Sequence, residues 1–189
     1  MEDRKIAIIT GASSGLGTEY ARLLDKEGLT EIWLIARRKD RLEALAETLE
    51  TKCRCLAVDL TDEKALNALE SEVVAAKMVV TYLVNAASKA FLLSYSRALS
   101  VELQTTGIQV TAVCPFWIKD TEFVDKAKET DRHKVYRDMP GATNAKHVAK
   151  VSLKEAKSGT VVCTPDPVSR MHRIVASLLP HWLLARVCK

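Results

Sequence analysis

The stretch Thr10-Gly11-Ala12-Ser13-Ser14-Gly15-Leu16-Gly17 follows directly on the apolar residues 5–9. The apolar run predicts a buried strand, and the glycines that follow it predict a turn that opens a helix. Such a turn brings backbone N–H groups and the positive end of the helix dipole to one point, which is an arrangement that holds phosphate. We therefore expect an anion-binding loop between a first strand and a first helix.

Each residue type in this loop suits that chemistry. Gly11 permits the tight turn off the strand, Gly15 lets a pyrophosphate approach the backbone, and Gly17 lets the helix lie close to the sheet. Ser13 and Ser14 offer hydroxyl donors and a helix cap. An ordinary strand-to-helix turn is the alternative, but the flanking strand and helix favour a dinucleotide site, to which we assign the loop from Gly11 to Gly17, Leu16 included.

The composition is that of an ordinary globular protein. The chain has 189 residues, of which 48% are hydrophobic and 28% charged, and this predicts a single domain spanning residues 1–189. The net charge of +4 is mild, so no nucleic-acid partner is expected. The five cysteines follow no metal-ligand spacing, so no metal site is expected either. Their odd number and the lack of a signal-peptide pattern favour a cytoplasmic location.

Strand and helix patterns alternate along the chain. Such alternation predicts an α/β fold with a doubly wound parallel sheet that is covered by helices on both faces. The expected strands are residues 5–10, 31–36, 53–58, 78–84, 108–115 and 160–164, and the expected helices are residues 14–27, 39–51, 61–77, 86–107 and 144–157.

Residues 174–187 are apolar, but Pro180, His181 and Arg186 interrupt them. The segment is too broken to predict a transmembrane helix. We expect a helix that covers the core or a partner subunit, and contact with a membrane interface is the alternative.

Two arginines after the second strand bear on the cofactor. An acidic residue about 20 positions beyond the glycine loop accepts the ribose 2′-hydroxyl of NAD, whereas arginine there favours the 2′-phosphate of NADP. Arg37 lies 20 residues after Gly17, Arg38 follows it, and the first acid is Asp40. A guanidinium fork matches phosphate oxygens, so we expect NADP rather than NAD. The alternative, a solvated basic start to the next helix, suits Lys39 better.

The segment TGASSGLG has the TGxxxGxG spacing of the short-chain dehydrogenase/reductase family, and residues 87–103 resemble the active-site helix of that family. The resemblance covers nearly the whole chain. It implies a Rossmann-type fold and hydride transfer between a nicotinamide cofactor and a small carbonyl or alcohol substrate. It also implies cofactor contacts, from Asp59 and Leu60 at the adenine and from Asn85, Lys89, Pro115 and Thr121 farther along the chain. A helix-capping role for Asp59 is the alternative.

The chain departs from the family pattern after Asn85. In the family a helix, a strand, the catalytic Ser and the Tyr of YxxxK follow this point, whereas here the sequence passes directly to Lys89, the remnant of the catalytic set. Tyr82 precedes Lys89 by seven residues and Tyr95 follows it by six, so neither takes the place of the catalytic phenol. We expect a sheet shortened by one helix–strand unit, with order 3-2-1-4-6-7 in family numbering.

Two functional hypotheses follow. The first is an NADP(H)-dependent oxidoreductase by lineage, with turnover absent or weak because no Ser or Tyr is assignable. The second is a non-catalytic nucleotide-binding or self-association domain, or a deletion product. In the family the helix at residues 86–107 is a dimer surface, so a homo-oligomer is expected, although core packing also explains its apolar residues Phe91, Leu92, Tyr95, Leu99 and Leu103.

Overall fold

The computed structural model describes residues 4–85, 90–105, 108–115, 118–119, 121, 142–168 and 170–171, with the side chains of residues 90–95 left out. Internal contacts divide the chain into two compact units: residues 1–87 with 121–123, and residues 88–120 with 124–189. We refer to these as unit 1 and unit 2. Within the described ranges, no helix is long and apolar enough to cross a membrane.

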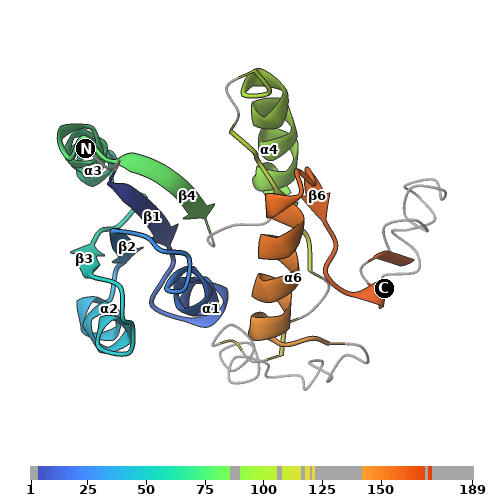
Figure 1. Cartoon of the computed structure of the whole chain (residues 1–189), viewed down its shortest axis with the longest axis horizontal. Coiled ribbons are helices and arrows are strands. Elements are labelled where there is room, and N and C mark those ends of the chain that lie inside the picture. The colour runs from blue at the N-terminus through green and yellow to red at the C-terminus, as the bar shows by residue number, and fades with distance from the viewer. Residues whose placement is uncertain are drawn as a thin grey trace. The chain divides into compact units, whose positions relative to one another are not determined.

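Unit 1 is a parallel four-stranded sheet with order β3-β2-β1-β4. Its strands are β1 (Lys5–Thr10), β2 (Glu31–Ala36), β3 (Cys53–Ala57) and β4 (Val79–Asn85), and its helices are α1 (Gly15–Leu24), α2 (Lys39–Ala46) and α3 (Glu63–Ala75). Figure 1 shows α1 and α2 on one side of the strands and α3 on the other. This is the Rossmann-like α/β arrangement that the sequence predicts.

The central strands carry the core of unit 1, because a parallel strand covered on both faces must be apolar almost throughout. The side chains of Ile6, Ile8, Trp33 and Ile35 form a buried cluster, against which Leu69 and Val73 of α3 pack. Glu31 is the buried exception in β2. Its carboxylate accepts a hydrogen bond of 3.2 Å from Trp33 Nε1 and lies 3.1 Å from Lys52 Nζ, so its charge is compensated.

The ladder between β1 and β4 contains one irregularity. Ile6 pairs with Val80, but Ala7 pairs with Tyr82, so Thr81 is an extra residue in β4. Beyond this bulge the pairing is regular and ends with Thr10 opposite Asn85. The ladders of β2 with β1 and with β3 show no such shift.

Unit 2 contains α4 (Ala90–Glu102), β5 (Ala112–Val113), α6 (Ala145–Lys157) and β6 (Val162–Cys163). β5 and β6 pair in parallel. Asn144 caps α6 by accepting a hydrogen bond of 2.7 Å from the backbone N–H of His147. Ala145, Val148, Ala149 and Ser152 form the buried face of this helix.

The expected continuous sheet of six strands is not what the described residues form. The order of the first four strands is confirmed, but β5 and β6 make a second, two-stranded sheet. β5 is also shorter than the expected strand at residues 108–115, because its ladder with β6 extends over only two pairs. A strand persists only where a partner satisfies its backbone groups. Whether the two units act as one domain stays a prediction.

Candidate nucleotide-binding site

The glycine loop lies between the carboxyl end of β1 and the first turn of α1, as the sequence predicts. Gly11 and Gly15 have φ values of 67° and 57°, in the left-handed region that favours glycine. A Cβ built on Gly17 would lie 2.4 Å from the carbonyl oxygen of Gly11, so only a hydrogen fits there. The start of α1 is thus packed closely against the loop at Gly11, whereas the expected role of Gly17 in letting the helix lie close to the sheet stays a prediction.

The first turn of α1 has no side-chain cap. The first four N–H groups of a helix have no acceptor within the helix. Ser14 occupies the N-cap position with extended backbone, but its side chain makes no capping hydrogen bond, so the expected serine cap is wrong in that respect. Thr18 Oγ1 instead donates to the carbonyl of Ala12 at 2.9 Å and ties the loop to the helix. A loop held in this way suits a pyrophosphate, whose oxygens would accept from the N–H groups.

Arg38 lies at the glycine loop. It directly precedes α2 and donates from Nη2 to Ser13 Oγ at 3.3 Å, which brings the arginine expected at the 2′-phosphate to the glycine loop. A guanidinium and a hydroxyl at this distance can share one anion. Arg37 is exposed beside it.

Asp59 and Leu60 follow β3 at the same edge of the sheet. Asp59 Oδ1 accepts from the N–H of Thr61 at 3.0 Å and from its hydroxyl at 2.8 Å. These two bonds, and to a lesser extent the charge of Arg37, lower the pKa of Asp59. The cap of α3 is Asp62, so Asp59 organises the turn before the helix rather than the helix end. Leu60 packs against the buried cluster of unit 1. The adenine contact of both residues stays a prediction.

Asn85 meets a residue that the sequence analysis did not single out. The Thr10 hydroxyl lies 3.1 Å from Asn85 Oδ1 and 3.4 Å from the carbonyl of Val84, at the carboxyl ends of adjacent strands. Thr10 is the first residue of the TGxxxGxG segment, so its place in that segment was the available signal. It holds the exposed Asn85 beside the glycine loop.

Thr121 also lies at the loop. A Cβ built on Gly15 would be 3.2 Å from Thr121 Cγ2, and both residues belong to unit 1. Pro115 belongs to unit 2 and is half-buried. Lys89 lies outside the described residues. The site therefore brings together the glycine loop, Arg38, Asn85 and Thr121, whereas the roles of Pro115 and Lys89 stay predictions.

No group of three or more His, Cys, Asp or Glu side chains within the described ranges is placed to hold a metal ion.

Two family models match the chain. The model for short chain dehydrogenase matches residues 5–88, and that for enoyl-(acyl carrier protein) reductase matches residues 71–156. The two overlap and together span residues 5–156, which include the glycine loop and all of β4. The chain belongs to the short-chain dehydrogenase/reductase family.

Some curated relatives match less than half of this chain, and others match most of it. A very-long-chain 3-oxoacyl-CoA reductase of Kluyveromyces lactis is 38% identical over 87 residues, which is 44% of this chain and 25% of that protein. An uncharacterized oxidoreductase of Staphylococcus epidermidis is 25% identical over 181 residues, which is 86% of this chain and 76% of that protein. The alignment thus spans only about a quarter of the yeast relative.

Solved structures share the fold. A short-chain dehydrogenase from Sphingobium yanoikuyae, solved in complex with NADPH, superposes with a TM-score of 0.74 at 20% identity and covers 92% of this chain and 93% of that one. L-Sorbose reductase from Gluconobacter frateurii, complexed with NADPH and L-sorbose, gives a TM-score of 0.70 at 19% identity over 87% of this chain and 95% of that one. At these levels of sequence identity, both superpositions show a similarity of fold alone.

Proposed function

We propose that unit 1 binds NADP(H) and that the chain is an oxidoreductase by lineage whose turnover is absent or weak. The observation that carries the cofactor assignment is the 3.3 Å hydrogen bond between Arg38 and Ser13, which places a guanidinium at the glycine loop. Complexes of the two fold neighbours with NADPH support the same cofactor.

Different residues of unit 1 would bind different parts of the cofactor. The N–H groups at the start of α1 would hold the pyrophosphate, and the absence of a Cβ on Gly15 would let it approach. Arg38, with Ser13 and the neighbouring Arg37, would hold the 2′-phosphate. When bound, the cofactor supplies a hydride donor or acceptor. This chain's own part would then be to fix its adenosine half.

The chemical step lacks an assigned proton donor. Reduction of a carbonyl needs a proton for the oxygen that forms, and the sequence offers neither the Ser nor the Tyr that would orient the carbonyl and supply that proton. Lys89 alone would contact the ribose. We therefore expect little or no steady oxidation of NADPH in the presence of a small ketone or aldehyde, and clear turnover would overturn this expectation.

Titration of the purified chain with NADPH and with NADH, followed by cofactor fluorescence, tests the binding. We expect NADPH to bind at least about tenfold more tightly, because each charge-assisted contact to phosphate contributes about 1.5–3 kcal/mol. Arg38→Ala should remove most of that preference and leave NADH affinity unchanged. Lys39→Ala is the matched control, since Lys39 is the adjacent cation and pairs with Glu43 at 3.3 Å. An equal loss in both variants, or no binding of either nucleotide by the folded wild-type chain, contradicts the assignment.

A non-catalytic self-association domain is the second candidate, and a cytoplasmic homo-oligomer is the state we propose for either function. Its support is the exposure of Val79, Val80 and Leu83 on β4, at 48%, 38% and 69%. Light scattering that gives only the mass of one chain would remove the oligomer from both candidates.

A further inference from the structure

The helices α1 and α2 are joined near both of their ends. Each of them follows one parallel strand and precedes the next, so both begin at the carboxyl edge of the sheet and end at the opposite edge. The two helices lie on the same side of the strands (Figure 1). At the carboxyl edge, Arg38 Nη2 donates to Ser13 Oγ. At the opposite edge, the contact is made by Asp25, the C-cap residue of α1.

Asp25 binds the segment that runs from α2 to β3. Its two carboxylate oxygens accept from the backbone N–H groups of Thr51 at 2.7 Å and of Glu50 at 3.2 Å, and the Thr51 hydroxyl donates to its carbonyl at 3.1 Å. Burial opposes the ionisation of Asp25, but these hydrogen bonds and the charge of Lys26 outweigh burial and lower its pKa. The carboxylate is therefore charged at neutral pH, and its hydrogen bonds are charge-assisted.

The turn between α2 and Glu50 connects this contact to the helix. The N–H groups of Thr48 and Leu49 donate to the carbonyls of Leu45 and Ala46 at 2.9 and 3.2 Å. The Thr48 hydroxyl also donates to the carbonyl of Leu45, at 2.7 Å. These three bonds close the turn, so the position of Glu50 fixes the end of α2.

Of the two helices, α2 is the one that this contact holds in place. It has eight residues, is about 12 Å long and buries only Leu42 and Leu45, whereas α1 buries four residues. Apolar contacts are non-directional, so they resist separation of α2 from the sheet but leave it able to slide. The bond from Arg38 to Ser13 is 3.3 Å long and therefore too weak to prevent such a shift. Because Arg38 is the N-cap residue of α2, a shift of the helix displaces the guanidinium.

We infer that Asp25 is a positioning residue for the 2′-phosphate of the cofactor. By holding the end of α2 against the end of α1, it sets where the Arg38 guanidinium lies relative to Ser13. The inference rests on the proposed binding of NADP(H), and it assigns part of the preference for NADPH over NADH to a residue at the opposite edge of the sheet. The pyrophosphate, which both nucleotides carry, would be held by α1 and would not depend on Asp25.

Fluorescence titration of the full chain with NADPH and with NADH tests the role of Asp25. Asp25→Ala should weaken NADPH binding at least about fivefold and change NADH binding less than about twofold, since part of a charge-assisted contact is lost from one nucleotide alone. Asp25→Asn keeps one acceptor oxygen, so it should weaken NADPH binding less than Asp25→Ala does, but at least about twofold. Circular dichroism checks that each variant folds, and Asp25→Asn decides the question if Asp25→Ala does not fold.

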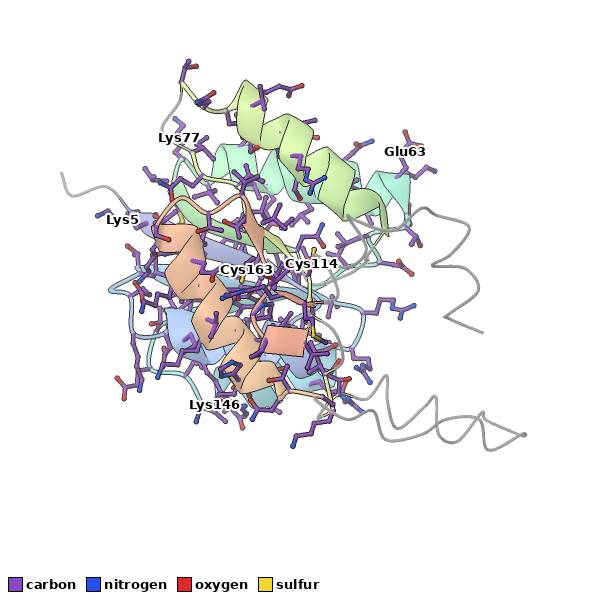
Figure 2. All side chains as sticks on the ribbon, turned by 90° about the vertical axis from the view of Figure 1, so that its right-hand side faces the viewer. Lys5, Glu63, Lys77, Cys114, Lys146 and Cys163 are labelled. Carbon is purple, nitrogen blue, oxygen red and sulfur yellow. The ribbon has the colours of Figure 1, made fainter. Side chains whose placement is uncertain are left out.

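Asp62→Ala is the matched control. Asp62 is also an aspartate of unit 1 that accepts from two backbone N–H groups, but it caps α3, on the other side of the sheet from α2 (Figure 1). Figure 2 labels Glu63, which follows it as the first residue of α3. Loss of this cap lowers stability but leaves α2 in place, so the ratio of the two nucleotide affinities should change less than about twofold. An equal loss of preference in Asp62→Ala and Asp25→Ala would mean general destabilisation and would overturn the inference.

A double variant tests whether Asp25 acts through Arg38. In Arg38→Ala the guanidinium is absent, so the addition of Asp25→Ala should weaken NADPH binding less than about twofold further. A further loss of about fivefold would mean that Asp25 acts by another route and would overturn the assignment. A wild-type preference for NADPH that persists unchanged in folded Asp25→Ala and Asp25→Asn overturns this inference alone, whereas a wild-type chain without that preference overturns the proposed function as well.

Discussion

The space next to Gly17 is bounded by backbone atoms and not by side chains. A Cβ there would lie 2.4 Å from the carbonyl oxygen and 2.8 Å from the carbonyl carbon of Gly11, and neither atom can move without moving the loop. Gly28 has the opposite character, because its φ is 65° but nothing lies within 4 Å of a Cβ built on it. Substitution of Gly17 therefore tests the effect of crowding, whereas substitution of Gly28 tests the effect of backbone strain.

We predict that Gly17→Ala lowers the free energy of unfolding by about 1–3 kcal/mol, as overpacking does, and weakens NADPH binding at least about tenfold because the loop shifts. Gly28→Ala should lower stability by about 1–2 kcal/mol through strain alone and leave NADPH affinity unchanged. Urea unfolding and the fluorescence titration measure the two effects. Loss of NADPH binding in folded Gly28→Ala would contradict this separation.

Glu31 is a buried acid, and its two partners, Trp33 and Lys52, contribute differently to the free energy of unfolding. Burial opposes its ionisation, but hydrogen bonds from Lys52 and Trp33 and the nearby positive charges outweigh burial and lower the pKa of Glu31 below its usual 4.5. A lowered pKa in the folded state means stability that is present above pH 4.5 and is lost as the pH falls through the folded value.

We predict that Glu31→Ala lowers the free energy of unfolding by about 1–3 kcal/mol, because the buried Trp33 Nε1–H then lacks its acceptor. Glu31→Gln should cost less, since the amide oxygen still accepts, and should remove the stability change below pH 4.5 that the wild-type carboxylate contributes. Lys52→Gln, with a side chain 74% exposed, should cost about 1 kcal/mol or less. Urea unfolding of the three variants at several pH values tests this order, and a larger loss in Lys52→Gln than in Glu31→Ala would reverse it.

The sequence predicted residue types at the site better than their contacts. Arginine after β2 and serine in the loop were both expected at a phosphate, and the structure joins Arg38 to Ser13. The link from Thr10 to Asn85 was missed, because it depends on the register of β1 with β4, which residue order along one chain does not specify. The expected serine cap was wrong, because the side chain of Ser14 makes no hydrogen bond to the first turn of α1.

At the scale of elements, α3 shows how a helix start is specified locally. Asp62 Oδ1 accepts from the N–H of Lys64 at 2.9 Å and of Ala65 at 3.4 Å, and Glu63 adds a negative charge to the first turn. The helix is 13 residues long and has no fully buried residue, although Leu69 and Val73 pack against the core of unit 1.

Asp62→Ala should therefore lower the free energy of unfolding by about 0.5–2 kcal/mol, whereas Asp62→Asn, which keeps an acceptor in place, should cost a few tenths. Chemical denaturation of the two variants measures the difference. Equal losses would mean that charge rather than capping is responsible.

Strand lengths followed local sequence only where a partner was present. β1 and β2 lie within a residue of their expected ranges, because both are buried between paired neighbours. The segment at residues 108–115 has an equally apolar pattern, yet only Ala112–Val113 forms a strand. The extent of this strand is set by its ladder with β6 and not by the apolar pattern of the segment.

For the whole molecule, the division into two units allows tryptophan fluorescence to follow the unfolding of one unit by itself. Trp33 lies in unit 1, whereas Trp117 and Trp182 belong to unit 2. With the latter two replaced by phenylalanine, tryptophan emission reports unit 1 alone, while circular dichroism reports both units.

We predict that NADPH at about 100 times its dissociation constant stabilises the Trp33 transition in urea by about 2.7 kcal/mol. The same concentration of NADH should shift it less, and circular dichroism should show a second step that does not move with NADPH. A single step that shifts as a whole would instead show that the two units unfold together.

The bulge at Thr81 also bears on which changes of length the sheet can accept. β4 has seven residues where β1 has six. One residue lost from the middle of β4 would merely close the bulge, and the strand would still begin opposite Lys5 and end opposite Thr10. β2 contains no bulge that could absorb a deletion, so the loss of one residue from β2 would draw Arg38 away from the glycine loop. Natural one-residue deletions should therefore be found in β4 of related chains and be rare in β2.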